Sequence, residues 1–339
     1  MPSFILIPDD YQNAAALLQT DPRHPCKSLG DLSRMPDGKR QLAEARALIL
    51  IRERTQVDAD LLAQMPHLKL ISQTGKLARN IDIDACSRAG VAVVEGSGSP
   101  HAPAELAWLL IMAARRRLAE NLASLRAGHW QGPIGQAVRG QTLGILGFGK
   151  IGKLVAGFGR AFGMEILVWG SERARAEALA LGYRAAACRE AFFAESDALS
   201  LHQRLLPATE GNVTQADLLA MKPTALLVNI SRAELIAPGA LEAALDAGRP
   251  GFAALDVFER EPIYQPEHPL LNRPNVLCTP HLGYAEEASY RQYLDIAYRN
   301  AVRFFDGDAS HVLNPQALNE DFMPQAPPDG RTHSGENHG

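Results

Sequence analysis

Gly147-Phe148-Gly149-Lys150-Ile151-Gly152 is the stretch that decides the fold, because its three glycines form a G-x-G-x-x-G pattern. An apolar run at 143–146 comes just before it, and an amphipathic segment to about residue 162 follows, which predicts strand, tight turn and helix. Glycine permits a sharp turn at 147, close approach of a pyrophosphate at 149 and helix–strand packing at 152. The first amides of the helix would face the phosphates. The stretch therefore predicts a dinucleotide-binding α/β unit.

Short apolar runs alternate with amphipathic segments on both sides of this loop, which indicates βα units with parallel strands. From the strand before the loop onward, six runs are predicted strands: 142–146, 166–169, 198–201, 225–230, 253–257 and 276–279. Four further runs lie upstream, at 4–7, 47–51, 68–72 and 91–94. The first series matches a doubly wound sheet, and the second a smaller α/β domain.

The order of these series predicts the domain organisation. Residues 103–126 read as one helix with Pro103 in its first turn, and 286–305 as a helix that follows the six strands of the series that begins at 142. We expect the last helix to return to the N-terminal α/β domain, which is then discontinuous. Residues 1–102 and 286–318 would form the substrate domain, and residues 103–285 would form the dinucleotide-binding domain. Residues 319–339 are rich in Pro, Gly, Asp and Asn without periodicity, which predicts a disordered tail.

The composition is that of a globular chain of two domains, with 339 residues, 46% hydrophobic residues and a net charge of −4. Mild acidity without a basic run argues against nucleic acid or membrane as a partner. The four scattered cysteines form no CxxC pair and are expected to be reduced core thiols, with no metal: Cys26, Cys86, Cys188 and Cys278. The first residues lack a basic, apolar leader, which predicts a cytoplasmic location.

The end of the second strand of the dinucleotide unit bears on cofactor choice. An acidic residue there would bind the adenosine ribose of NAD, but this position is Gly170. Glu172, two residues on, could reach the ribose. Alternatively Ser171, Arg173 and Arg175 could hold the 2′-phosphate of NADP, since arginine matches phosphate oxygens. The same residues also read as the solvated first turn of a helix. We expect NADP or NAD, with NADP favoured.

Three ionisable residues follow later strands of the same series. Arg232, Glu261 and His281 each come just after an apolar run, where parallel sheets place their working residues. The reduction of a 2-oxo acid needs a cation that binds the substrate carboxylate and an imidazole that transfers a proton. It also needs a carboxylate beside the imidazole to tune it. Taken singly, Arg232 could be a helix-cap cation, Glu261 a surface charge and His281 a packed loop histidine. Together with the glycine loop, the three residues favour catalysis.

With these motifs the chain resembles the D-isomer-specific 2-hydroxyacid dehydrogenase family from about residue 68 to 315. The resemblance rests on the glycine loop, Leu201-His202 with Pro207, Asn229-Ile230-Ser231-Arg232, Asp256-Val257-Phe258 to Glu261-Pro262, and Pro280-His281. It implies a Rossmann NAD(P)-binding domain inserted in a smaller, flavodoxin-like substrate domain, both doubly wound. It also implies hydride transfer between NAD(P)H and a small 2-oxo acid or D-2-hydroxy acid.

The resemblance assigns roles to single residues. Arg232 binds the substrate carboxylate, His281 donates or accepts the proton, and Glu261 pairs with His281. The resemblance also implies that Lys150, Ile151, Gln203 and Ile230 line the cofactor and that Asp256 holds the nicotinamide carboxamide. The other residues expected at the cofactor follow from the glycine loop and the end of the second strand: Gly147, Gly149, Gly152, Ser171, Glu172 and Arg173. His202 and His268 receive no proton-transfer role and are expected to be structural.

The substrate side departs from the family pattern. The loop at 74–82 matches the family loop whose amides bind the substrate carboxylate, but Lys76 and Leu77 replace a small residue and a glycine. Lys76 either adds a second positive charge for an acidic or phosphorylated substrate or is a solvated lysine. The segment 115–130 resembles the arm that clasps a partner subunit, which predicts a homodimer, although its three arginines also read as a solvated helix face.

Two functions follow from these observations. The first is an NAD(P)-dependent D-2-hydroxyacid dehydrogenase that works as a 2-oxoacid reductase. The second is an NAD(H)-sensing scaffold with little turnover, such as the corepressors related to these enzymes, which also keep the three ionisable residues. Turnover of 2-oxo acids discriminates between them.

Overall fold

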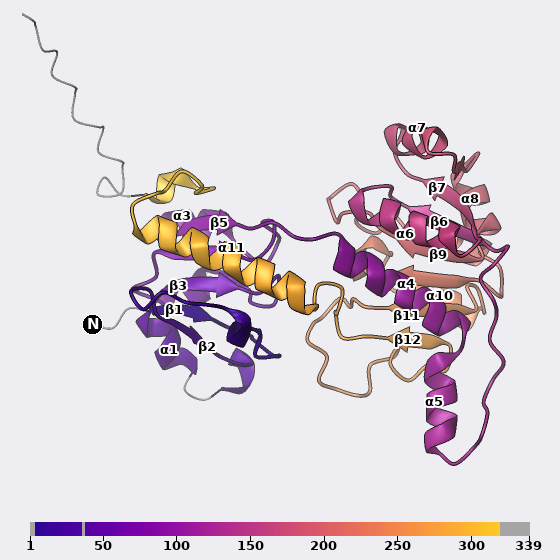
Figure 1. Ribbon diagram of the computed structural model, residues 1–339, viewed down its shortest axis with the longest axis horizontal. Helices are drawn as coiled ribbons and strands as arrows, with labels where there is room; N and C mark the ends of the chain where they lie inside the picture. Colours follow the sequence, from indigo (N-terminus) through magenta and orange to yellow (C-terminus); the bar gives the residue numbers. More distant parts are fainter. Residues whose placement is uncertain (1–3, 36–37, 319–339) are drawn as a thin grey trace, which may run out of the picture. The chain divides into compact units, whose positions relative to one another are not determined.

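The computed structural model describes residues 4–35 and 38–318, and they form two compact units. Unit 1 combines the residues up to Gly98 with those from Tyr290 on, and unit 2 runs from Ser99 to Ser289. The sequence placed the two junctions at 102/103 and 285/286. The expected disordered tail, 319–339, lies outside the described residues. Figure 1 shows the helices and strands of both units.

Unit 2 is built on a parallel sheet in the order β12-β11-β10-β9-β6-β7-β8. Its strands are β6 (Thr142–Leu146), β7 (Glu165–Trp169), β8 (Arg184–Ala185), β9 (Ala198–Leu201), β10 (Leu226–Asn229), β11 (Phe252–Leu255) and β12 (Val276–Cys278). The strand order reverses between β6 and β9, which is the point where open α/β sheets bind ligands. Six strands were expected; β8 was missed because it has only two residues and no apolar run.

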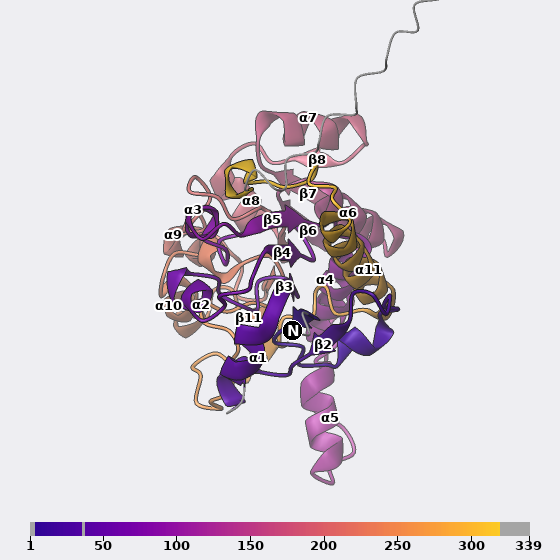
Figure 2. The same cartoon turned by 90° about the vertical axis from the view of Figure 1, so that its left-hand side faces the viewer.

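Helices cover both faces of this sheet, as a doubly wound fold requires. One apolar cluster joins α4 (His101–Arg115), α6 (Lys150–Ala161) and α7 (Glu172–Ala180) to one face. The other joins α8 (Arg189–Glu195), α9 (Gln215–Ala220) and α10 (Ala240–Asp246) to the opposite face. The short turn η3 (Ala233–Leu235) follows β10, and α5 (Leu118–Arg126) projects from the sheet (Figures 1 and 2).

The expected single helix at 103–126 is two helices. Arg117 adopts a left-handed backbone with a φ of 51°, which ends α4 and starts α5 in a new direction. The arginine run is also not a uniformly solvated face. Arg115 is buried and donates hydrogen bonds to Gln136 Oε1 and to the carbonyl of Thr224, both at 2.9 Å. Its burial lowers the pKa of the guanidinium, while these bonds satisfy its Nη1 atom.

Unit 1 holds a second parallel sheet, in the order β2-β1-β3-β4-β5. Its strands are β1 (Phe4–Ile7), β2 (Cys26–Ser28), β3 (Ala45–Leu50), β4 (Leu70–Gln73) and β5 (Ala92–Glu95). This is the flavodoxin-like order, with the reversal between β1 and β3. Four strands were expected; the fifth, β2, was missed because its three residues, Cys-Lys-Ser, lie at the sheet edge, where only Cys26 is partly buried and the other two are exposed.

The faces of this sheet are covered by helices from both ends of the chain (Figure 2). The core on one face includes residues of α1 (Gly38–Glu44), α2 (Ala59–Ala63) and α3 (Ile83–Arg88). On the other, α11 (Glu287–Phe305) lies against β4, where Ser72 Oγ donates to the Ala297 carbonyl at 2.9 Å. The short turns are η1 (Ala14–Leu17), η2 (Leu32–Arg34) and η4 (Pro315–Ala317). The return of α11 explains why unit 1 is discontinuous.

The cysteines differ in burial. All four belong to the described part of the chain and are free thiols, but only Cys86 is buried. Cys26 and Cys278 are partly buried, while Cys188 is exposed, which corrects the expectation of core thiols. Cys188 starts α8, and its Sγ accepts the Ala191 amide at 3.4 Å, so a capping position explains its exposure. Among the described helices, none is both long and apolar enough to cross a membrane.

Candidate active site

The three ionisable residues singled out in the sequence lie at one edge of the unit 2 sheet. β10, β11 and β12 are neighbouring parallel strands, with Asn229 opposite Leu255 and Leu255 opposite Cys278. Arg232 follows the end of β10 by three residues, and His281 follows the end of β12 by three. The three strands β10, β11 and β12 therefore end side by side, at the carboxyl edge where such sheets carry their functional groups.

Glu261 and His281 are in direct contact. His281 Nδ1 lies 2.5 Å from Glu261 Oε2. A carboxylate can only accept, so Nδ1 carries the hydrogen and Nε2 is left for other partners. The second oxygen of Glu261 accepts the Phe258 amide at 2.8 Å, which fixes the carboxylate to the backbone. Both side chains keep some exposure, 23% for His281 and 31% for Glu261, so a ligand can reach the pair.

The loop that carries His281 is held by a buried carboxylate. Asp256 is fully buried and accepts the Thr279 hydroxyl at 2.6 Å and the amides of Leu282 and Gly283 at 2.7 and 2.8 Å. Its burial raises the pKa, while these hydrogen bonds and the charge of His281 oppose that rise. His281 itself has a left-handed backbone, with a φ of 52°. Asp256 therefore stabilises an unfavourable turn that presents the imidazole.

Tyr284, three residues after His281, is a further neighbour of the imidazole. It is buried, and its ring meets the imidazole edge to face, with centroids 5.3 Å apart. Together with Glu261, it limits the rotation of the imidazole.

Arg232 is partly buried and extended, directly before η3. Its carbonyl accepts Asn229 Nδ2 at 2.8 Å, and its Nη1 donates to the Ser231 carbonyl at 2.5 Å. The Asn229 side chain also accepts the Ser231 amide, at 3.0 Å. The Asn-Ile-Ser-Arg motif is thus a compact turn that orients the guanidinium.

The glycine loop lies between β6 and α6 and is shaped by close packing. Gly147 has a φ of 92°, and a Cβ there would lie 2.9 Å from backbone atoms of His202 and Gln203. At Gly152 a Cβ would lie 2.4 Å from the Gly147 carbonyl oxygen. Gly149 has open space around it and is exposed. A tight turn with an open amide-rich face before a helix fits a pyrophosphate.

The other residues expected at the cofactor line the same edge. Lys150 is exposed at the start of α6, Ile151 is partly buried, and Ile230 is buried after β10. Gln203 follows β9 and accepts Asn212 Nδ2 at 3.1 Å. His202 lies beside the glycine loop, and neither ring nitrogen has a hydrogen-bond partner in the described structure. Burial lowers the pKa of His202 to about 3, so its imidazole stays neutral.

The residues that bear on the choice between NAD and NADP follow the end of β7. The Trp169 carbonyl accepts the Gly147 amide at 2.9 Å, which joins this strand end to the glycine loop. Ser171 caps α7 by accepting the Ala174 amide, while Glu172 and Arg173 are exposed in the first turn. The Arg175 guanidinium stacks on the Trp169 ring at 4.8 Å. Both an acidic and two basic side chains therefore lie near this end of the loop.

In unit 1, the expected substrate residues are already engaged. Lys76 Nζ donates to Glu95 Oε1 at 2.5 Å, and the Leu77 amide donates to Glu95 Oε2 at 2.8 Å. The Arg52 guanidinium packs against Gly75, since a Cβ on that glycine would lie 1.8 Å from Nη1. Neither Arg52 nor Glu95 was singled out in the sequence. The sequence could have indicated them only by position, because Arg52 comes just after β3 and Glu95 is the last residue of β5.

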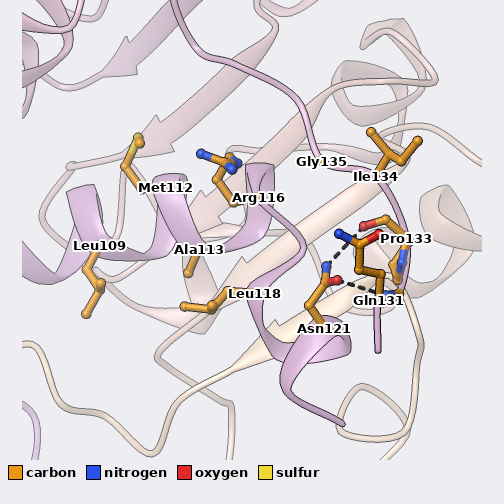
Figure 3. A pocket seen from close by; sticks show the side chains of 11 residues that line it. Leu109, Met112, Ala113, Arg116, Leu118, Asn121, Gln131, Pro133, Ile134 and Gly135 are labelled. Atoms are coloured by element: carbon orange, nitrogen blue, oxygen red, sulfur yellow. Dashed lines mark hydrogen bonds between the residues drawn. The ribbon is translucent and has the colours of Figure 1, made fainter. Parts of the chain in front are cut away.

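A separate pocket of about 600 Å³ lies beside α4 and α5 in unit 2. Figure 3 shows Asn121 reaching the loop that closes it, where it donates to the Pro133 carbonyl and accepts the Gly132 amide, both at 3.0 Å. The walls combine apolar and polar side chains from Leu109, Met112, Ala113, Arg116, Leu118, Asn121, Gln131, Pro133 and Ile134. Leu109 and Ile134 are 57% and 94% exposed, which leaves a large apolar surface uncovered.

Comparisons with known proteins agree with this architecture. The model for the D-isomer specific 2-hydroxyacid dehydrogenase NAD binding domain matches residues 108–283. The chain is 39% identical over 264 residues to a glyoxylate reductase of Aeropyrum pernix, covering 74% of this chain and 78% of the relative. It is 38% identical over 301 residues to a D-3-phosphoglycerate dehydrogenase of Mycobacterium leprae, covering 85% and 56%. A solved phosphoglycerate oxidoreductase of Vibrio cholerae o395 is 51% identical, with a TM-score of 0.84 and coverage of 90% and 99%.

The fold, the glycine loop and these matches define an oxidoreductase with a Rossmann unit for an NAD-type cofactor. The chain belongs to the D-isomer-specific 2-hydroxyacid dehydrogenase family.

Proposed function

We propose that this chain reduces a small 2-oxo acid to a D-2-hydroxy acid, with His281 as the proton donor. The observation that carries the proposal is the 2.5 Å contact between His281 Nδ1 and Glu261 Oε2. It leaves Nε2 to exchange a proton with the substrate, and the carboxylate stabilises the imidazolium that donates it. As the carbonyl carbon accepts a hydride, Nε2 gives its proton to the carbonyl oxygen. In the oxidative direction Nε2 takes the proton back.

Arg232 is proposed to bind the substrate carboxylate. A guanidinium stays charged and matches a planar carboxylate with two parallel donors, which orients the neighbouring carbonyl. The compact turn around Asn229 and Ser231 supports this role, because it limits the positions open to the side chain. The loop with Lys76 and Leu77 is proposed to select the substrate.

The glycine loop is proposed to hold the pyrophosphate of the cofactor, with Lys150, Ile151, Gln203 and Ile230 beside it. When bound, the nicotinamide supplies the hydride. Asp256 already accepts three hydrogen bonds, so a carboxamide could use only the remaining lone-pair position of that carboxylate. We favour NADP over NAD, because Gly170 has no carboxylate that could bind the ribose. Arg173 and Arg175, a few residues after Gly170, could instead bind a 2′-phosphate. Ser171 would join them, while Glu172 is the residue that would favour NAD.

The experiment that tests this function is a survey of turnover. NADPH and NADH oxidation would be followed by absorbance with glyoxylate, hydroxypyruvate, pyruvate and phenylpyruvate. Reduction of any of them supports the reductase, and the ratio of the two cofactor rates decides the preference. Equal turnover with both cofactors would contradict the NADP assignment. If none of the four acids is reduced while the cofactor still binds, the result would contradict the reductase function and favour a cofactor-sensing scaffold. The proposed location is the cytoplasm.

We also propose that the chain forms a homodimer through α5 and the segment that follows it. Large apolar side chains are exposed there, including Leu122 at 43%, Leu125 at 54% and Trp130 at 84%. Such a surface favours a protein partner over solvent, and a second copy satisfies it symmetrically. Sedimentation equilibrium should give a dimer that Leu125→Asp with Trp130→Ala dissociates. A single monomeric species of the wild-type chain would contradict the dimer.

A further inference from the structure

Glu95 of unit 1 holds both donors that the substrate loop was expected to offer. Its Oε1 atom accepts Lys76 Nζ at 2.5 Å, and its Oε2 atom accepts the Leu77 amide at 2.8 Å. The lysine side chain is 67% exposed and the Glu95 side chain 23%. The Glu95 carboxylate therefore already binds both the Lys76 ammonium and the Leu77 backbone amide.

The position of Glu95 in the sheet explains this arrangement. β4 and β5 are parallel neighbours, and their last residues, Gln73 and Glu95, lie opposite each other. The loops that leave them are also joined, because the Gly96 amide donates to the Gly75 carbonyl at 2.9 Å. Glu95 thus lies at the carboxyl edge of the unit 1 sheet, where parallel sheets bind ligands.

The loop is supported from its other side as well. The Arg52 amide donates to Thr74 Oγ1 at 2.9 Å, and the Leu77 side chain packs against the apolar core of unit 1. These contacts restrict the backbone on both sides of Lys76. The Leu77 amide is consequently directed at Glu95 by the fold of the loop and not by the lysine alone.

An anionic substrate group at this loop would compete with Glu95. It would need the same ammonium and the same amide, and it would meet a carboxylate of like charge close by. The Lys76–Glu95 pair as a whole carries no net charge, so it does not add the extra positive charge considered from the sequence. A group without charge meets no such competition.

We propose that Glu95 is a specificity-determining residue, which disfavours 2-oxo acids that carry a second carboxylate or a phosphate and so favours monoanionic ones. This inference rests on the proposed reductase function. It assigns no part in proton or hydride transfer to Glu95, so its removal should change substrate preference and not the chemistry.

The test compares two substrates that differ by one carboxylate, pyruvate and oxaloacetate. The kcat/KM ratio of oxaloacetate to pyruvate would be measured for the wild-type enzyme, Glu95→Gln and Glu95→Ala. Glutamine keeps an acceptor for the Leu77 amide but releases Lys76, and alanine releases both donors. The wild-type enzyme should prefer pyruvate, and the ratio should rise about tenfold or more in both variants. Lys76→Met in the Glu95→Gln background should abolish the rise, because the released ammonium causes it.

Circular dichroism and thermal unfolding would show that each variant is folded. A folded Glu95→Gln enzyme that turns over pyruvate with an unchanged ratio would overturn the inference while leaving the reductase function in place. A wild-type preference for oxaloacetate would overturn it too. Failure of the wild-type enzyme on every 2-oxo acid would instead overturn the proposed function, and this inference with it.

Discussion

His281 and Glu261 are joined by a contact of 2.5 Å between Nδ1 and Oε2, and the other carboxylate oxygen is fixed to the Phe258 amide. The imidazole is therefore held through a side chain that is itself tied to the backbone. Because Nδ1 is used in this way, only Nε2 can exchange a proton with a substrate. This one relationship decides which atom of the histidine acts and why Glu261 is needed.

Glu261→Gln tests that relationship. Glutamine keeps an oxygen for the Phe258 amide but removes the charge that stabilises the imidazolium. Since a hydrogen bond to a charged group is worth about 1.5–3 kcal/mol, kcat/KM should fall roughly 10- to 100-fold. Steady-state kinetics on the best 2-oxo acid would measure the loss. Glu259→Gln, at an exposed neighbour, is the control, and an equal effect of both substitutions would contradict the specific role of Glu261.

Arg232→Lys keeps the positive charge but loses the two-donor fork. We expect kcat/KM for the 2-oxo acid to fall roughly 10- to 100-fold, because an ammonium replaces one of two charge-assisted bonds at best. Cofactor affinity, measured by fluorescence titration, should not change. Arg184→Lys is a suitable control because Arg184 lies in β8, at the opposite edge of the sheet. Full activity of the Arg232→Lys enzyme would refute the carboxylate-binding role.

Gly147→Ala should weaken cofactor binding and stability. The new Cβ would lie 2.9 Å from backbone atoms of His202 and Gln203, and the φ of 92° disfavours any side chain. Such backbone strain costs on the order of 1–3 kcal/mol. Gly157→Ala is the matched control in α6, where a Cβ meets open space, and it should stabilise the helix by roughly 0.5–1 kcal/mol. Thermal unfolding and NADPH titration would measure both effects; unchanged binding by Gly147→Ala would contradict the assigned turn.

His202 should make unit 2 sensitive to acid. Its pKa is lowered by burial from 6.5 to about 3, so the unfolded chain binds a proton that the folded chain excludes. Stability is then lost as the pH falls below the unfolded pKa, by roughly 2 kcal/mol between pH 6.5 and 4.5. Urea unfolding across this range should show a shallower pH dependence for His202→Phe. His129→Asn, at an exposed histidine, should keep the wild-type dependence, and equal slopes for all three proteins would contradict the burial of the His202 ring nitrogens.

Much of the fold could be predicted from the sequence because it depends on local patterns. Buried parallel strands appear as continuous apolar runs, and the turn at Gly147 has a distinctive spacing. The missed strands, β2 and β8, are short and lie at sheet edges, where burial does not demand apolar residues. The break at Arg117 was missed because it depends on one left-handed residue with no glycine to mark it.

The candidate site was predictable where position along the chain determines it. Arg232 and His281 follow strand ends, so the parallel topology brings them to one edge. The side-chain partners were not predictable in the same way. Glu95 contacts a loop 18 residues away, and Tyr284 meets the imidazole through a turn that Asp256 holds. These contacts depend on loop conformation, which apolar periodicity does not report.

The most direct test of the central claim is the kcat for NADPH oxidation with glyoxylate by His281→Ala. His268→Asn is the matched control, because His268 lies between β11 and β12, contacts the Phe258 ring and has no proposed role. Loss of a general acid should lower kcat by roughly 10²- to 10⁴-fold, with NADPH affinity unchanged and the control near wild type. A His281→Ala enzyme that keeps near wild-type turnover would contradict the assignment of His281 as the proton donor.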